Sequence, residues 1–198
     1  MSKDRLLAFS DGVLAIIITI MVLELRPPHG AELADLRGLL PTFAGYVLSF
    51  LYVGIYWNNH HHMLALAERV NGAVLWANLH LLFWLSLLPF TTAWMAEHPD
   101  GSWPAAVYGL DLLGAGIAYW IVQLLLVRAQ GEDHAMSEAL GADLKGKSSP
   151  VLYIAGIAAA FYSSWAAQAF YVAVALLWLI PDPRMERVVV RRREGGAR

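Results

Sequence analysis

Long apolar runs constrain this chain more than any other feature of its sequence. A helix that crosses the hydrocarbon of a bilayer needs roughly 20 apolar residues, and runs of about that length occupy residues 5–25, 39–62, 72–96 and 104–128. The chain is 58% hydrophobic and 15% charged, whereas a soluble domain is about half apolar and about a quarter charged. The sequence therefore predicts an all-α integral membrane protein that forms a single transmembrane domain over residues 1–198.

The distribution of basic residues decides how the last apolar block, after the polar stretch 128–149, is organised. If the block is two short helices at residues 149–163 and 166–180, only Arg26 and Arg37 lie outside, and 12 of the 14 Lys and Arg residues are cytoplasmic. This is the asymmetry that the positive-inside rule requires. The sequence thus predicts six transmembrane helices with both termini in the cytoplasm, followed by a basic cytoplasmic tail over 182–198.

The two last helices are each predicted to be about 14 residues long, which is roughly 21 Å at 1.5 Å per residue. That is too short to span about 30 Å of hydrocarbon without help. We expect them to lean on neighbouring helices or to thin the bilayer locally.

Several classes of protein find no support in the composition. The chain has no cysteine and a formal net charge of -2, so thiolate metal sites, cysteine nucleophiles and a nucleic-acid partner are not expected. No nucleotide-binding, hydrolase or zinc-protease motif occurs. The consecutive histidines 60–62 point about 100° apart on a helix and cannot all reach one ion. We therefore expect no enzyme, no cofactor and no bound metal.

The first apolar run has a polar side and an apolar side. Ser10 and Asp11 lie near its start, and an ionisable group inside a membrane costs at least ~2.5 kcal/mol unless it is paired or hydrated. The opposite face, at 100° per residue, is nearly all apolar and groups Phe9, Gly12, Ile16, Thr19, Ile20 and Leu23. Two interpretations of Ser10 and Asp11 are open. The pair either only joins the helix to its neighbours, or it also positions the apolar face around something else.

Polar groups that could hold Ser10 and Asp11 occur at the same side of the membrane. They are Arg5, Trp57, His60 to His62, Asn78 and His80. Asp111, in the fourth apolar run, is a further buried polar candidate, for which helix packing and a position at the outer mouth are both open.

The opening pattern Arg5-x-x-x-Phe9-Ser10-Asp11 resembles the signature of the transmembrane protein 175 family of potassium channels. The resemblance extends to Trp57 with the histidines after it, to residues 76–79 and 88–91, and to the closing segment 178–182 with its basic tail. It implies a homotetramer of six-helix subunits in which the first helix of each subunit lines a central pore. It also implies a polar network around the motif, formed by Arg5, Phe9, Ser10, Asp11, His60, Asn78 and His80.

The family lacks the Thr-Val-Gly-Tyr-Gly filter of other potassium channels, and this sequence has none. The resemblance implies instead a narrow ring formed by Ile16, with Thr19 or Ile20 and Leu23 in the next layers. Such a ring makes ions shed water, and potassium, which is less tightly hydrated than sodium, passes more readily.

The function we expect is thus a moderately selective, potassium-favouring channel in the plasma membrane of a prokaryote, whose partners are its own copies, membrane lipids and potassium ions. Two alternatives remain open. One is a proton- or ion-coupled transporter that uses Asp11 and His80, and the other is a membrane metalloenzyme that uses the histidine run.

Overall fold

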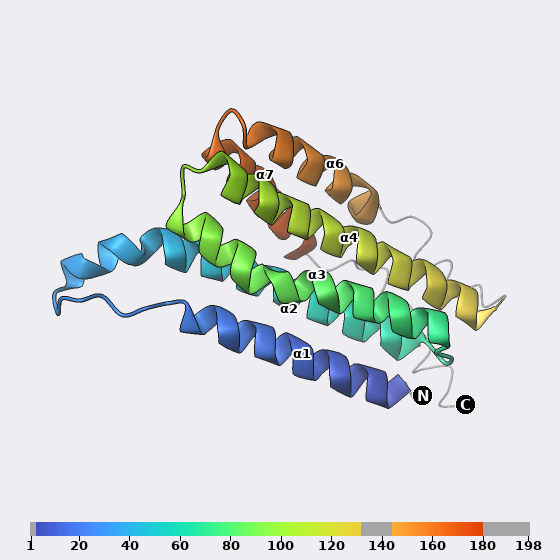
Figure 1. The fold of residues 1–198 in the computed structure, drawn as a ribbon. Coiled ribbons are helices and arrows are strands. Elements are labelled where there is room, and N and C mark those ends of the chain that lie inside the picture. The colour runs from blue at the N-terminus through green and yellow to red at the C-terminus, as the bar shows by residue number, and fades with distance from the viewer. Residues whose placement is uncertain (1–2, 132–143, 180–198) are drawn as a thin grey trace.

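The structure, a computed structural model, describes residues 3–131 and 144–179. Within them the chain forms six α-helices and one 3-10 helix (Figure 1). The elements are α1 (Lys3–Leu23), η1 (Leu33–Leu39), α2 (Leu40–Leu66), α3 (Gly72–Glu97), α4 (Ser102–Gln130), α6 (Leu144–Ala159) and α7 (Ser164–Leu179). The prediction of an all-α fold with six helices is confirmed. The predicted tail 182–198 lies outside the described residues.

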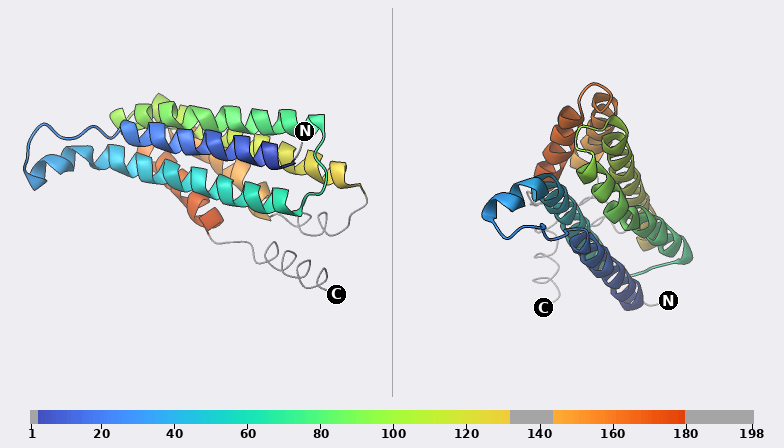
Figure 2. Two further views of the ribbon diagram at one scale, coloured as in Figure 1. Left: turned by 90° about the horizontal axis from the view of Figure 1, so that it is seen from below. Right: turned by 60° about the vertical axis from the view of Figure 1, so that its left-hand side comes forward.

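The helices run alternately in opposite directions, so that the chain goes up and down through one bundle (Figure 1). α1 packs on α2 and α3, whereas α6 and α7 pack on each other, on α4 and, for α7, on α2. Two further views show α1 at one side of the bundle and the α6–α7 hairpin at the other (Figure 2). One face of α1 therefore has no neighbour within the described chain.

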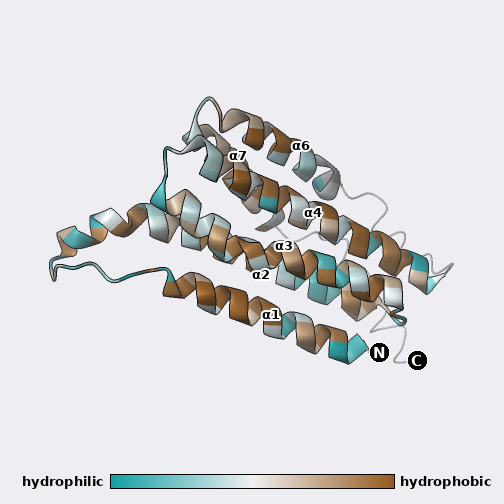
Figure 3. Cartoon of the chain, viewed as in Figure 1, coloured by the Kyte–Doolittle hydropathy of each residue, from teal (hydrophilic) through white to brown (hydrophobic). Residues whose placement is uncertain are grey.

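Four helical segments are long and apolar enough to cross a membrane, judged by length and composition: Lys3–Leu23, Leu33–Leu66, Gly72–Glu97 and Ser102–Gln130. Hydrophobic residues predominate along these helices, with hydrophilic residues toward their ends and at some positions within them (Figure 3). α6 and α7 have 16 residues each, or about 24 Å at 1.5 Å per residue, which is less than the thickness of the hydrocarbon. The chain is a multi-pass membrane protein.

The largest difference from the sequence prediction is at α6, which begins at Leu144 and ends at Ala159 instead of covering 149–163. Its first turns are polar and resemble a loop in sequence. They are helical in the structure, where Ser149 turns inward, donates to the carbonyl of Lys145 at 2.7 Å and accepts from Trp178 Nε1 at 2.8 Å. The hairpin turn then closes at 160–163, where backbone amides bond back to Gly156, Ala158 and Ala159.

Asp111 lies between α3 and α4 and is 2% exposed. Thr91 Oγ1 donates to its Oδ2 at 2.8 Å, while Oδ1 has no hydrogen-bond partner in the described part of the chain. A second polar contact involves Thr92 and Tyr108, which are close in sequence to Thr91 and Asp111. Ser49 Oγ of α2 lies 2.6 Å from Thr92 Oγ1 and 2.9 Å from Tyr108 Oη. Of the two positions left open for Asp111, the structure shows a contact between packed helices.

A glycine of α4 makes room for an aromatic ring of α3. Trp84 of α3 lies against Gly114, and a methyl group added at Gly114 would overlap the indole ring. Small residues allow membrane helices to approach in this way. We expect Gly114→Ala to lower the free energy of unfolding by about 1–2 kcal/mol, because overpacking typically costs about 1–3 kcal/mol and alanine regains up to about 1 kcal/mol as the better helix former. Thermal unfolding of the purified protein measures the loss.

Gly116, on the same helix, is the matched control. A carbon added there would lie 3.6 Å from Tyr153 Cε2 and 3.7 Å from Tyr56 Oη, which is ordinary van der Waals contact. Gly116→Ala should therefore unfold at the temperature of the wild type or slightly above it, because alanine is the better helix former, and equal destabilisation by both alanines would contradict this account of the α3–α4 contact.

Candidate functional site on helix α1

α1 divides into a buried face and an exposed face. Its buried residues recur every three or four positions and pack against α2 and α3: Leu6, Ser10, Leu14, Ile17 and Met21. The exposed face carries large apolar side chains, since Phe9 is 53% exposed, Ile16 59%, Ile20 43% and Leu23 77%. Thr19 is also exposed, with Oγ1 donating to the carbonyl of Ile16 at 2.8 Å. These are the residues that the sequence grouped on one apolar face.

A chain of buried polar groups joins α1 to α2 and α3. Ser10 Oγ donates to the carbonyl of Leu6 at 2.9 Å and accepts from Asn78 Nδ2 at 2.9 Å. Asn78 Oδ1 in turn lies 2.7 Å from His60 Nε2. All three side chains are at most 3% exposed, so each depends on the others for its hydrogen bonds. The chain fixes the rotation of α1 about its own axis, and with it the direction of the exposed face.

Asp11 makes a separate contact beside this chain. Its Oδ1 accepts a hydrogen bond from Trp57 Nε1 of α2 at 3.0 Å, and the Trp57 ring lies 6.1 Å from the ring of His61. Unlike Ser10, Asp11 is exposed in the single chain. The carboxylate therefore lies at the edge of the exposed face of α1, held by one indole.

The other residues expected in the network lie apart from it. His80 is exposed and accepts from Trp84 Nε1 on its own helix at 3.0 Å. Arg5 is exposed and has no hydrogen bond or ion pair within the part of the chain that the structure describes. His62 Nδ1 lies 2.8 Å from the carbonyl of Asn58, one turn earlier. Among the described residues, no three His, Cys, Asp or Glu side chains gather as a metal site would require.

Two residues that bond to the turn between α2 and α3 were not predicted from the sequence. Lys3 Nζ donates to the carbonyl of Ala67 at 3.0 Å, in the turn between α2 and α3. Gln130, the last residue of α4, accepts from the amides of Glu68 and Arg69 in the same turn at 2.8 and 3.1 Å and donates to the carbonyl of Arg69 at 2.9 Å. The only sequence signal for these contacts is a polar residue at the end of an apolar run.

The fold and the site define a multi-pass membrane protein whose first helix has a buried polar anchor and an uncovered apolar face. The family described as "Endosomal/lysosomal potassium channel TMEM175" matches residues 5–89, which include Ser10, Asp11, His60 and Asn78. A potassium channel of Chryseobacterium is 51% identical over 187 residues, covering 94% of this chain and 97% of its own. A potassium channel of Chamaesiphon minutus is 31% identical over 173 residues, covering 81% of this chain and 85% of its own.

The fold agrees with a solved structure. The crystal structure of a lysosomal potassium-selective channel TMEM175 homolog from Chamaesiphon minutus aligns with a TM-score of 0.77 and 27% identity, over 90% of this chain and 96% of that one. The human relative, an endosomal/lysosomal proton channel, is 27% identical over 130 residues, which cover 63% of this chain and 25% of its own. The chain belongs to the TMEM175 family and is an ion channel.

Proposed function

We propose that this protein is a potassium-favouring channel of a prokaryotic plasma membrane, assembled as a homotetramer around the exposed faces of four α1 helices. The observation that carries the proposal is that Ile16 is 59% exposed on a helix whose opposite face is packed. A symmetric oligomer explains an apolar face that is exposed in the single chain, because it brings the same face of each copy together. Names of bacterial relatives, which are potassium channels, support the choice of ion.

In this assembly, Ile16 forms the narrow ring, and Thr19 or Ile20 and then Leu23 form the layers beyond it. These positions are exposed and succeed one another along one side of α1. An apolar ring offers no oxygen to replace lost water, so an ion passes according to how readily it dehydrates, and potassium is favoured over sodium. Ser10, Asn78 and His60 act at a distance by holding the helix in its rotation, since their polar atoms bond to one another.

The geometry does not favour the alternative of a coupled transporter in which Asp11 and His80 form a relay. Asp11 bonds to Trp57 and His80 to Trp84, so the two groups occupy separate contacts. Proton conduction by a channel is favoured by one finding, the proton-channel names of the vertebrate relatives, which match 50 to 64% of this chain. A current that follows the proton gradient instead of the potassium gradient would support it.

Cysteine labelling tests the assignment of the pore face directly, because the chain has no native cysteine. Ile16→Cys places a thiol on the exposed face, and we expect a cationic methanethiosulfonate reagent to block most of the current there. Ile17→Cys is the matched control, since Ile17 is 3% exposed and packs against the neighbouring helices. Recordings in planar bilayers before and after the reagent measure the block.

Equal block at both positions, or none at Ile16→Cys, would contradict the pore assignment. The same experiment with Thr19→Cys and Ile20→Cys decides which of these side chains faces the axis. Both are exposed in the single chain.

A further inference from the structure

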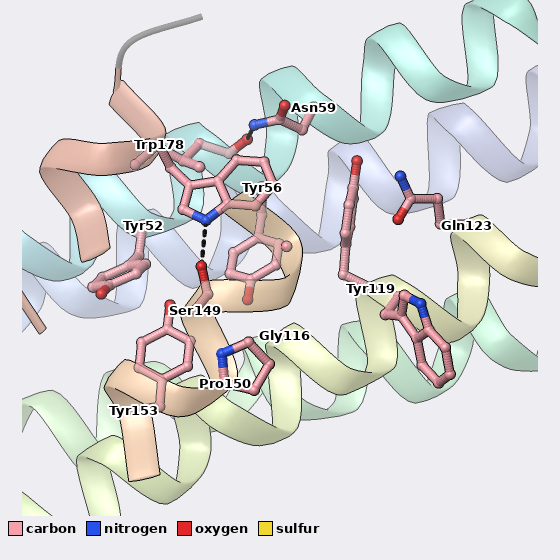
Figure 4. Close-up of a pocket in the computed structure, with 13 residues that line it drawn as sticks. Tyr52, Tyr56, Asn59, Gly116, Tyr119, Gln123, Ser149, Pro150, Tyr153 and Trp178 are labelled. Carbon is pink, nitrogen blue, oxygen red and sulfur yellow. Dashed lines mark hydrogen bonds between the residues drawn. The ribbon is translucent and has the colours of Figure 1, made fainter. Parts of the chain in front are cut away.

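A cavity of about 50 Å³ lies between α2, α4, α6 and α7 (Figure 4), and none of its lining residues belongs to α1. Its walls are Tyr52 and Tyr56 of α2, Gly116 and Tyr119 of α4, Tyr153 of α6 and Trp178 of α7. A buried water needs about 10–15 Å³ of such space, so the cavity has room for a few waters or for a short run of methylene groups. The exposed face of α1 does not contribute to the cavity.

The walls favour hydrocarbon over water. Six of the 13 lining residues are aromatic, and several of the hydrogen-bond donors in the lining are already used by the protein. Tyr52 Oη donates to the carbonyl of Tyr171 at 2.6 Å, Trp178 Nε1 donates to Ser149 Oγ at 2.8 Å, and Asn59 Nδ2 donates to the carbonyl of Ile55 at 2.8 Å. A water is stable in a cavity only with two to four polar partners, and cavities lined by apolar groups stay dry.

The depth of the cavity places lipid chains beside it. Gly116 is at the midpoint of α4, which runs from Ser102 to Gln130, and is therefore near the centre of a membrane-spanning helix. α6 and α7 are too short to cover the full length of α4, and the cavity lies beside the first half of α6, from Gly146 to Tyr153, and the last turn of α7, at Trp178. Trp120, which is 59% exposed, also lines the cavity and marks its opening to the outer surface.

We propose that this cavity holds an acyl chain of a membrane phospholipid. The chain enters beside Trp120 and reaches toward Gly116, and its ester end lies near Asn59 and Gln123, two polar side chains of the lining. The chain fills the space that the short α6–α7 hairpin leaves open within the bilayer. Arg128, beyond Gln123 on α4, and Lys145, next to the lining residue Gly146, put positive charge at this end, which suits an anionic headgroup.

The test uses dioleoyl phosphatidylglycerol as the probe and native mass spectrometry of the purified full chain as the measurement. Gly116→Phe fills the cavity with a ring, and Ile117→Phe adds the same ring at the neighbouring position, which is 42% exposed and outside the lining. Excluding two or three methylene groups, at about 0.8 kcal/mol each, weakens binding about tenfold or more. We expect Gly116→Phe to retain at least about tenfold less phosphatidylglycerol than the wild type. Ile117→Phe should retain as much phosphatidylglycerol as the wild type.

Gly116→Val keeps the proposal testable if the phenylalanine prevents folding. Its first carbon is in ordinary contact with Tyr153 at 3.6 Å, so the smaller side chain fits and only narrows the space. We expect retention between those of the wild type and Gly116→Phe. Equal lipid retention in the wild type and the Gly116 variants would overturn the proposal, and so would an equal loss of lipid in Ile117→Phe. Water density that fills the cavity in an electron microscopy map of the protein in phosphatidylglycerol nanodiscs would also overturn it.

Discussion

Ile16→Asn should raise sodium permeability and bring the potassium-to-sodium permeability ratio several-fold closer to one. The side chain is 59% exposed on the unpacked face of α1, so the change leaves the helix packing of the single chain in place. Asparagine offers an amide that bonds to water, which hydrates the ring and lets ions pass with more of their shell. The measurement is the reversal potential of the reconstituted protein between equal concentrations of KCl and NaCl.

Ile16→Leu is the control, because it keeps an apolar side chain of the same volume in the ring. It should keep most of the selectivity of the wild type. An unchanged permeability ratio in Ile16→Asn would show that the ions are selected elsewhere.

Asn78→Leu should lower the free energy of unfolding by roughly 2–4 kcal/mol and reduce the current by loosening α1. Asn78 is the middle member of the buried chain, and its loss leaves His60 without that partner while Ser10 keeps its bond to the carbonyl of Leu6. An interhelical hydrogen bond in a membrane contributes about 0.6 kcal/mol on average, whereas an unsatisfied buried polar group costs roughly 1–3 kcal/mol. The unpaired His60 is therefore expected to dominate the effect.

Thermal unfolding in detergent measures this loss. Asn58→Leu is the matched control, since Asn58 is exposed on α2, and a surface change of this kind usually stays within about 0.5 kcal/mol. A similar melting temperature for Asn78→Leu and the wild type would mean that the Ser10–Asn78–His60 chain does not stabilise α1.

The helices could be predicted from the sequence because membrane length and charge asymmetry are strong constraints. The two faces of α1 followed from the period of 3.6 residues, which separates Ser10 from Ile16 whatever the neighbours are. The start of α6 could not be predicted, because its polar first turns are stabilised by tertiary contacts such as the one between Ser149 and Trp178. The cavity escaped prediction for the same reason, since its walls come from four helices.

The members of the polar chain could be predicted only in part. Ser10, His60 and Asn78 were grouped as polar residues at one side of the membrane, and hydrogen bonds join their side chains in the structure. His80 was grouped with them, yet residues two apart on a helix point about 200° apart. Only one of Asn78 and His80 can face α1, and the sequence does not give the rotation of α3 that selects Asn78.

The proposed pathway of conduction is the exposed face of α1, and the proposed preference is for potassium over sodium. The most direct test is the reversal potential of the purified wild-type protein in a planar bilayer with equal concentrations of KCl on one side and NaCl on the other. The proposal predicts a reversal potential shifted from zero, with the sign of a potassium-favouring pore. A current that reverses at zero, or that follows only an imposed proton gradient, would contradict it.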